Sequence, residues 1–125
     1  MMVKVLLVER NVILRNHLLD VLSHDEHLDI IEWCTEGCEV VEFLKDNQVD
    51  IILMDHLQTN GLVVTAQIKR DYPSVKIIGF STGDVNDSNN RLMELGATGC
   101  LSKYDTDLEE LVAKIKRFTN SDFVF

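Results

Sequence analysis

Side chains that could act together on a phosphoryl group follow four apolar runs of this 125-residue chain. They are Glu9, Asp55, Ser81 and Lys103. A carboxylate can act as a nucleophile toward phosphorus and form an aspartyl phosphate. A lysine and a hydroxyl nearby would stabilise the charge of the transferred group, usually with Mg²⁺ held by further carboxylates. The residue types therefore predict phosphoryl chemistry centred on Asp55.

Each of these side chains needs a strand to position it, and the runs have strand length. The apolar runs are 3–8, 49–54, 75–80 and 97–101, and a more polar run covers 28–33. Such runs are typical of strands buried on both faces of a parallel sheet, and the polar one is expected near the sheet edge. Because ligands bind beyond the carboxyl ends of parallel strands, we expect the four side chains to share one edge.

Helical patterns separate the runs. We predict helices at 11–23, 35–47 and 62–71, one that ends near Leu95, and one from Thr106 to Phe118. Asn11 is a candidate N-cap, and Gly96 is a candidate C-cap. The helix before Leu95 has few apolar residues, so we expect it to be the least stable element. Five strand–helix units predict one α/β domain with a parallel sheet.

Composition excludes several classes of function. Twelve basic and twenty-one acidic residues give a net charge of -9, which argues against direct nucleic-acid binding. No run reaches the length of a membrane span, and no secretory pattern opens the chain, so we expect a cytoplasmic protein. Three cysteines without a CxxC pair predict free thiols.

In combination these motifs resemble the receiver domains of two-component response regulators. The matching segments are Val5-Leu6-Leu7-Val8 with the acidic residue that follows, Asp50-Ile51-Ile52-Leu53-Met54-Asp55, Asn60-Gly61-Leu62, Pro73-Ser74-Val75-Lys76-Ile77-Ile78, and Gly96-Ala97-Thr98-Gly99-Cys100-Leu101-Ser102-Lys103. The resemblance implies a receiver domain at 2–118 and a C-terminal tail at 119–125. It also implies a flavodoxin-like fold, with five parallel strands in the order 2-1-3-4-5 and five helices.

The resemblance assigns a role to each candidate residue. Asp55 matches the phosphoacceptor, Ser81 the hydroxyl that moves onto the phosphoryl group, and Lys103 the lysine that contacts it. The implied protein is not an enzyme in its own right. It would accept a phosphoryl group from a histidine kinase or phosphotransfer protein and signal to a downstream protein, and a homodimer is left open.

Four features depart from the family pattern, one of which is Tyr104 in place of the frequent proline after Lys103. Arg10 replaces the second of two adjacent acids that hold Mg²⁺, and a guanidinium offers no acceptor, so it argues against a strong site at Glu9, Asp55 and the Leu57 carbonyl. The loop after Asp55 is two residues short, which would shift that carbonyl. Cys100 replaces the switch aromatic. These departures favour an alternative function, that of a pseudo-receiver that binds proteins without phosphorylation.

Two side chains near Asp55 have more than one interpretation. Arg10 is either a tolerated surface replacement or a partner for the Asp55 carboxylate that imitates the charge of the metal. His56 could contact a phosphoryl group, but we favour a position in solvent.

Overall fold

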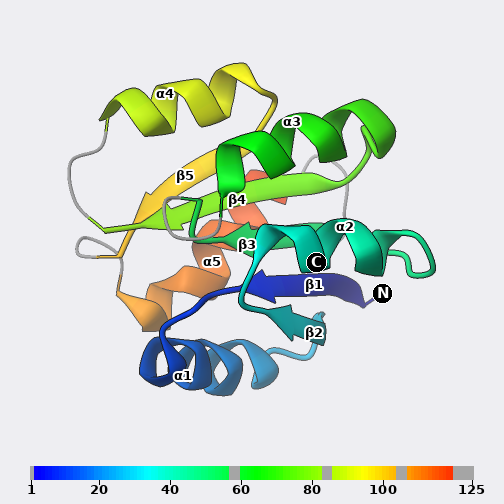
Figure 1. Ribbon diagram of the computed structural model, residues 1–125. Coiled ribbons are helices and arrows are strands. Elements are labelled where there is room, and N and C mark those ends of the chain that lie inside the picture. The colour runs from blue at the N-terminus through cyan, green and yellow to red at the C-terminus, as the bar shows by residue number, and fades with distance from the viewer. Residues whose placement is uncertain (1, 57–59, 83–85, 104–106, 120–125) are drawn as a thin grey trace.

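The computed structural model describes residues 2–56, 60–82, 86–103 and 107–119 of the chain, and strands alternate with helices throughout (Figure 1). The strands are β1 (Val3–Val8), β2 (Leu28–Cys34), β3 (Ile51–Met54), β4 (Lys76–Ser81) and β5 (Gly99–Ser102). The helices are α1 (Val12–Ser23), α2 (Gly37–Leu44), α3 (Gly61–Asp71), α4 (Asn86–Glu94) and α5 (Leu108–Thr119).

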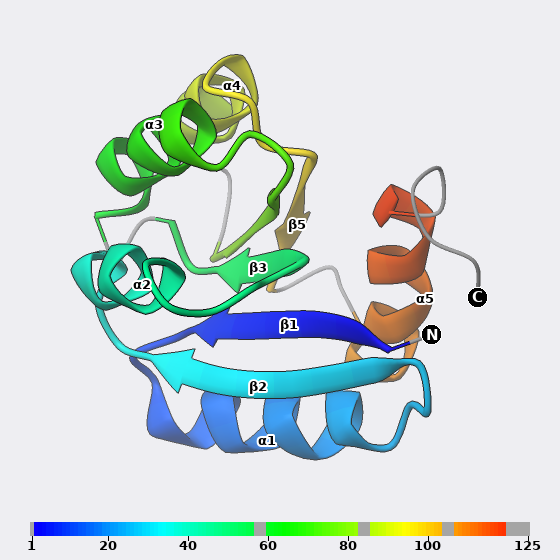
Figure 2. The ribbon, with the colours of Figure 1, turned by 90° about the vertical axis from the view of Figure 1, so that its right-hand side faces the viewer.

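The five strands form one parallel sheet in the order β2-β1-β3-β4-β5. This confirms the predicted flavodoxin-like architecture and the position of β2 at an edge. Figure 2 shows α1 and α5 on one side of the sheet, and α2, α3 and α4 on the other. The apolar runs are buried because helices cover both faces, as a parallel sheet requires.

Two apolar cores result from the alternation of side chains along each strand. On one face, Val5 and Leu7 pack in a cluster with Leu18 of α1 and Ile115 of α5. On the other face, residues of opposite parity join a cluster that includes Val40 of α2, Ile68 of α3 and Leu92 of α4. Because β1 and β3 contribute to both clusters, they form the centre of the domain.

Local signals fix several helix ends as predicted. The Asn11 side chain accepts a hydrogen bond from the Leu14 N–H at 3.0 Å and caps α1. Gly96 ends α4 with a φ of 109°, a left-handed conformation that costs glycine little. The helix predicted at 35–47 is shorter in the structure: it begins at Gly37, where Glu36 and Glu39 form a capping box, and it ends at Leu44.

The helix predicted to be least stable is α4. Leu92 is its fully buried hydrophobic side chain, whereas Met93 is 44% exposed, and Leu95 just beyond the helix is partly exposed. The polar sequence therefore leaves α4 with a narrow apolar contact to the sheet. Leu57, Thr106 and the tail from 120 onward lie outside the described residues, as does the side chain of Phe118.

Among the helices that the structure describes, none combines the length and the apolar character needed to cross a membrane.

Candidate functional site

The register of the sheet brings the carboxyl ends of the strands together. The Asp55 N–H donates to the Val8 carbonyl at 3.0 Å, so Asp55 leaves β3 beside the end of β1. In the same way the Lys103 N–H donates to the Ser81 carbonyl at 2.7 Å. These backbone hydrogen bonds extend the parallel pairing by one residue beyond the strands. They therefore fix the backbone positions of Asp55 and Lys103.

Lys103 bridges the two carboxylates at this edge. Its Nζ lies 2.7 Å from Asp55 Oδ2 and 2.8 Å from Glu9 Oε2. The side chains of Asp55 and Glu9 are 3% and 2% exposed, and that of Lys103 is 11% exposed. Burial alone would lower the pKa of Lys103, but the hydrogen bonds and charges of both carboxylates outweigh it, so the net pKa is raised. The ammonium compensates two carboxylates that would otherwise repel each other.

A pocket of about 350 Å³ opens over this ion-pair cluster. Its lining residues are Glu9, Arg10, Asn11, Asp55, Thr82 and Lys103. Ser81, the predicted hydroxyl, is buried at the end of β4 and is not among them. Thr82 is exposed and supplies the hydroxyl of the pocket lining, a role that the sequence reasoning did not give it. The alternation of side chains along a strand was the signal that could have separated the two hydroxyls.

Arg10 points to α2 and not to Asp55. Its guanidinium forms an ion pair with Glu36, and its Nε donates to the Thr35 carbonyl at 3.4 Å. The hydrogen bond that Arg10 donates to Glu36 is the main reason that the pKa of Arg10 is raised. The structure therefore supports the interpretation of Arg10 as a surface replacement. Lys103, and not Arg10, forms the ion pair with Asp55.

The side chains of the pocket fit a Mg²⁺ ion poorly. Mg²⁺ prefers oxygen ligands in octahedral geometry, whereas the two carboxylates here share the Lys103 ammonium. The described ranges contain no group of three His, Cys, Asp or Glu side chains that could hold a metal. The Leu57 carbonyl, the third predicted ligand, lies outside those ranges.

The prediction that His56 faces solvent was wrong. His56 is 2% exposed, and its Nε2 lies 2.9 Å from Oδ1 of Asn89 on α4. Its ring packs on Gly79 of β4, where a Cβ atom would lie 2.7 Å from Nδ1. Nδ1 is buried and has no hydrogen-bond partner in the described structure, so the neutral ring donates through Nε2. Burial lowers the pKa of His56.

Cys100, at the predicted switch position, lies on the same side of β5 as α4. Its Sγ is 3.8 Å from the Asn89 carbonyl, and burial raises the pKa of the thiol. Asn89 therefore contacts both His56, which follows Asp55, and Cys100 on β5. No local pattern marks Asn89 in the sequence, because its two partners are 33 and 11 residues away.

Comparisons with known proteins match this architecture to one family. A model of the response regulator receiver domain matches residues 5–116. Response regulator GacA of Pseudomonas aeruginosa is 27% identical over 118 residues, which cover 93% of this chain and 55% of GacA. Transcriptional regulatory protein LnrK of Bacillus subtilis is 33% identical over 104 residues, which cover 82% of this chain and 47% of LnrK. The chain thus spans about half the length of these curated relatives.

Solved structures agree on the fold. A response regulator from Thermotoga maritima superposes with a TM-score of 0.84 at 19% identity, over 96% of this chain and 99% of that one. A two-component response regulator of the LuxR family from Aurantimonas gives a TM-score of 0.87 at 20% identity, over 97% of this chain and 87% of that one.

Replacing Lys103 should expose the repulsion between the two buried carboxylates. We expect Lys103→Met to lower the free energy of unfolding by about 2 to 3 kcal/mol, somewhat less than for a fully buried pair because the lysine is partly exposed. Urea unfolding at neutral pH measures the change. Lys45→Met, which removes an exposed ion pair with Glu42, is the control and should have no measurable effect. Equal effects of the two variants would contradict the bridging role.

His56 should make stability depend on pH below neutrality. Its folded-state pKa lies below the unfolded value of 6.5, so the unfolded chain takes up the proton first and stability falls as the pH drops through that value. Between about pH 7.5 and 5.5, wild type should lose more unfolding free energy than His56→Gln. The exposed His24 gives the control His24→Gln, which should behave as wild type. Identical pH profiles for wild type and His56→Gln would contradict a buried neutral ring.

Proposed function

Because this chain belongs to the response regulator receiver domain family, a non-enzymatic signalling module of two-component systems, we propose that Asp55 is its phosphoacceptor. A two-component receiver has a histidine kinase as its partner. In the proposed reaction, a kinase or phosphotransfer protein presents a phosphohistidine to the pocket. A carboxylate oxygen of Asp55 forms the new P–O bond while the P–N bond breaks, and the histidine leaves as neutral imidazole after it takes up a proton.

The contact between Lys103 and Asp55 is the observation that carries this proposal. An ammonium 2.7 Å from the carboxylate that attacks phosphorus is well placed to move onto the charged oxygens of a bound phosphoryl group. The pocket lies directly over Asp55 and has room for such a group. Two hydroxyl side chains lie at the end of β4. We propose that Ser81 contacts the phosphoryl group, and Thr82 is a second candidate for this contact.

The signal would travel from the phosphoryl group to α4. His56 follows Asp55 directly in the chain and holds α4 through Asn89, while Cys100 contacts the backbone of the same residue. A shift of the β3 or β4 ends would therefore change how α4 sits on the sheet. With its narrow apolar contact, α4 is suited to be the two-state element, read by a downstream protein.

A pseudo-receiver is the second candidate function, and specific observations favour it. Lys103 already satisfies both buried carboxylates without a phosphoryl group or a metal. Arg10 replaces an acid of the metal site, which would make the chain an atypical member of the family. Cys100 is smaller than the aromatic of the usual switch. In this case the domain would act only through protein contacts.

We also propose that the receiver domain covers residues 2–118 and that residues 119–125 form a C-terminal tail. Receiver domains typically bind Mg²⁺, and we propose that Arg10 weakens this binding here. We also propose a cytoplasmic location and no direct nucleic-acid contact, the latter because the net charge is -9. The downstream protein is unassigned, and a homodimer is left open.

Acetyl phosphate distinguishes the two candidate functions. With Mg²⁺ present, we expect intact-mass measurement to show one added phosphoryl group on wild type and none on Asp55→Asn, because the amide is not a nucleophile toward phosphorus. A receiver that is known to react serves as the positive control. If that control reacts and wild type does not, the pseudo-receiver is the correct function.

Arg10→Asp should restore a metal site. The substitution replaces a guanidinium with an acceptor beside Glu9 and Asp55, so we expect Mg²⁺ affinity to rise by at least about tenfold in a calorimetric titration. Glu36→Gln removes the partner of Arg10 but adds no ligand, and it should leave Mg²⁺ affinity close to that of wild type. Unchanged binding in Arg10→Asp would show that Arg10 does not limit the site.

A further inference from the structure

The outer edge of β2 offers a strand-pairing surface. In the described sheet β2 is hydrogen-bonded to β1 alone, so its other side faces away from the sheet. The Trp33 N–H donates to the Glu32 side chain at 3.0 Å and not to a neighbouring strand. The Glu32 side chain therefore accepts from this backbone donor at the sheet edge, and a carbonyl of a partner strand could replace it.

Two hollows flank this edge, one on each face of the sheet. The hollow beside α1 has a volume of about 430 Å³, and Leu19, Ile30 and Trp33 contribute to its lining. The hollow beside α2 has a volume of about 560 Å³, and Trp33 and Phe43 contribute to its lining. Glu32 and Trp33 line both, so the hollows meet at the strand edge. Side chains of an added strand would alternate between the two faces and enter one hollow after the other.

Trp33 gives this edge an ordered apolar anchor. The residue is 43% exposed, although a tryptophan is a costly side chain to leave in water. The guanidinium of Arg15, which is itself 8% exposed, lies 3.8 Å from the centroid of its ring and holds it in place. A ring that is already held loses little conformational entropy when a partner covers it.

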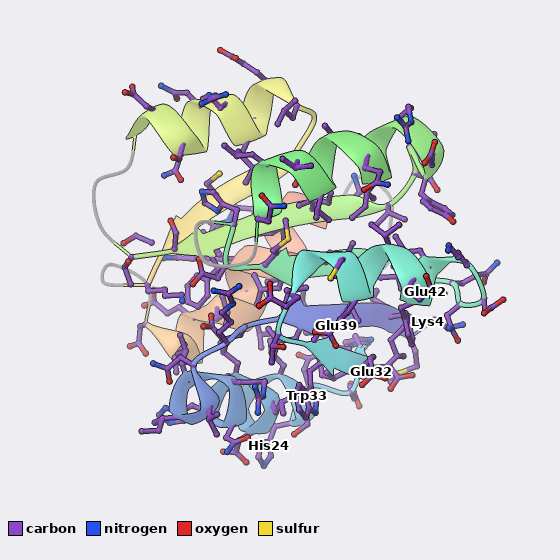
Figure 3. All side chains as sticks on the ribbon, in the orientation of Figure 1. Lys4, His24, Glu32, Trp33, Glu39 and Glu42 are labelled. Carbon is purple, nitrogen blue, oxygen red and sulfur yellow. The ribbon has the colours of Figure 1, made fainter. Side chains whose placement is uncertain are left out.

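The acidic charge around this edge favours a basic partner. Residues 28–47 carry six acidic residues and one basic residue: Asp29, Glu32, Glu36, Glu39, Glu42 and Asp46 against Lys45. Arg10 pairs with Glu36 and Lys45 pairs with Glu42, so an excess of acidic side chains remains. In Figure 3, Glu39 and Glu42 lie on the side of α2 nearest to β2, which carries Glu32 and Trp33. Glu39, Glu42 and Asp46 line the hollow beside α2. A second copy of this chain would bring like charges together, whereas a basic segment would complement them.

We propose that the β2 edge groove, formed by β2 and the two flanking hollows, binds an extended Lys- or Arg-rich segment of a partner protein by strand addition. Main-chain hydrogen bonds to β2 would align the segment, apolar side chains would cover Trp33, and basic side chains would pair with the carboxylates of α2. This surface lies apart from the Asp55 pocket, with which it shares no lining residue, and it does not require phosphorylation.

A labelled peptide of about ten residues, in which lysine alternates with valine, is the probe. Fluorescence anisotropy at low and at physiological salt should show saturable binding to the full chain. Two control peptides test the mode of binding: one has glutamate in place of lysine, and one has proline in place of alternate valines, which removes backbone donors. Both controls should bind at least about tenfold more weakly.

Variants locate the binding site. Trp33→Ala should weaken binding by about tenfold, and Glu42→Lys/Asp46→Lys by about fivefold at low salt. The matched controls are Val63→Ala, an exposed apolar truncation on α3, and Glu94→Lys/Glu110→Lys, the same charge change on α4 and α5. Both controls should bind as wild type does. Circular dichroism confirms that each variant is folded, and the charge variant keeps the test valid if Trp33→Ala unfolds.

Other outcomes would overturn the proposal. Absence of saturable binding, or equal binding of the proline peptide, would exclude strand addition. Equal binding by Glu42→Lys/Asp46→Lys and wild type would exclude the acidic rim. A dimer in sedimentation that Trp33→Ala dissociates would assign the edge to a second copy. Asp55→Asn should bind the peptide unchanged, so failure here is distinguishable from failure of the phosphoacceptor proposal.

Discussion

The ion pair of one ammonium with two buried carboxylates is the constraint on which this site depends. Glu9 and Asp55 each end a strand of the sheet, and both are almost fully removed from solvent. Two such charges so close together are tolerated only if a cation compensates them. Lys103 supplies that cation from a third strand, with both contacts shorter than 3 Å. The ion pairs of Lys103 with the two carboxylates therefore form the charged floor of the pocket and also stabilise the fold around it.

The orientation of Arg10 has a structural explanation in this arrangement. Lys103 already neutralises Asp55, so Arg10 is not needed for that purpose. The Arg10 guanidinium instead connects the end of β1 to the start of α2 through Glu36. Glu36, its partner, is also part of the capping box of that helix. One ion pair therefore links the edge of the pocket to α2, the helix whose carboxylates line the β2 edge groove.

The histidine next to Asp55 shows how a small change at the site could reach a helix. His56 fills the space above Gly79, where a side chain would collide with the ring, and it reaches Asn89 on α4. This hydrogen bond links α4 to the residue that follows Asp55, in addition to the buried side chain of Leu92. His56 and Cys100 thus add contacts to Asn89 of α4, beside the apolar contact that Leu92 makes with the core.

The fold class, and the position of Glu9, Asp55 and Lys103 at the carboxyl edge, could be predicted from the sequence, and the strand order from the resemblance. Apolar runs, caps such as Asn11 and the left-handed Gly96 are local signals, so they can be recognised without the structure. The partners of Arg10, the burial of His56 and the exposure of Trp33 became visible only in the folded structure. Each depends on contacts between elements that are distant in the chain, and a residue's local pattern contains no information about which distant group will face it.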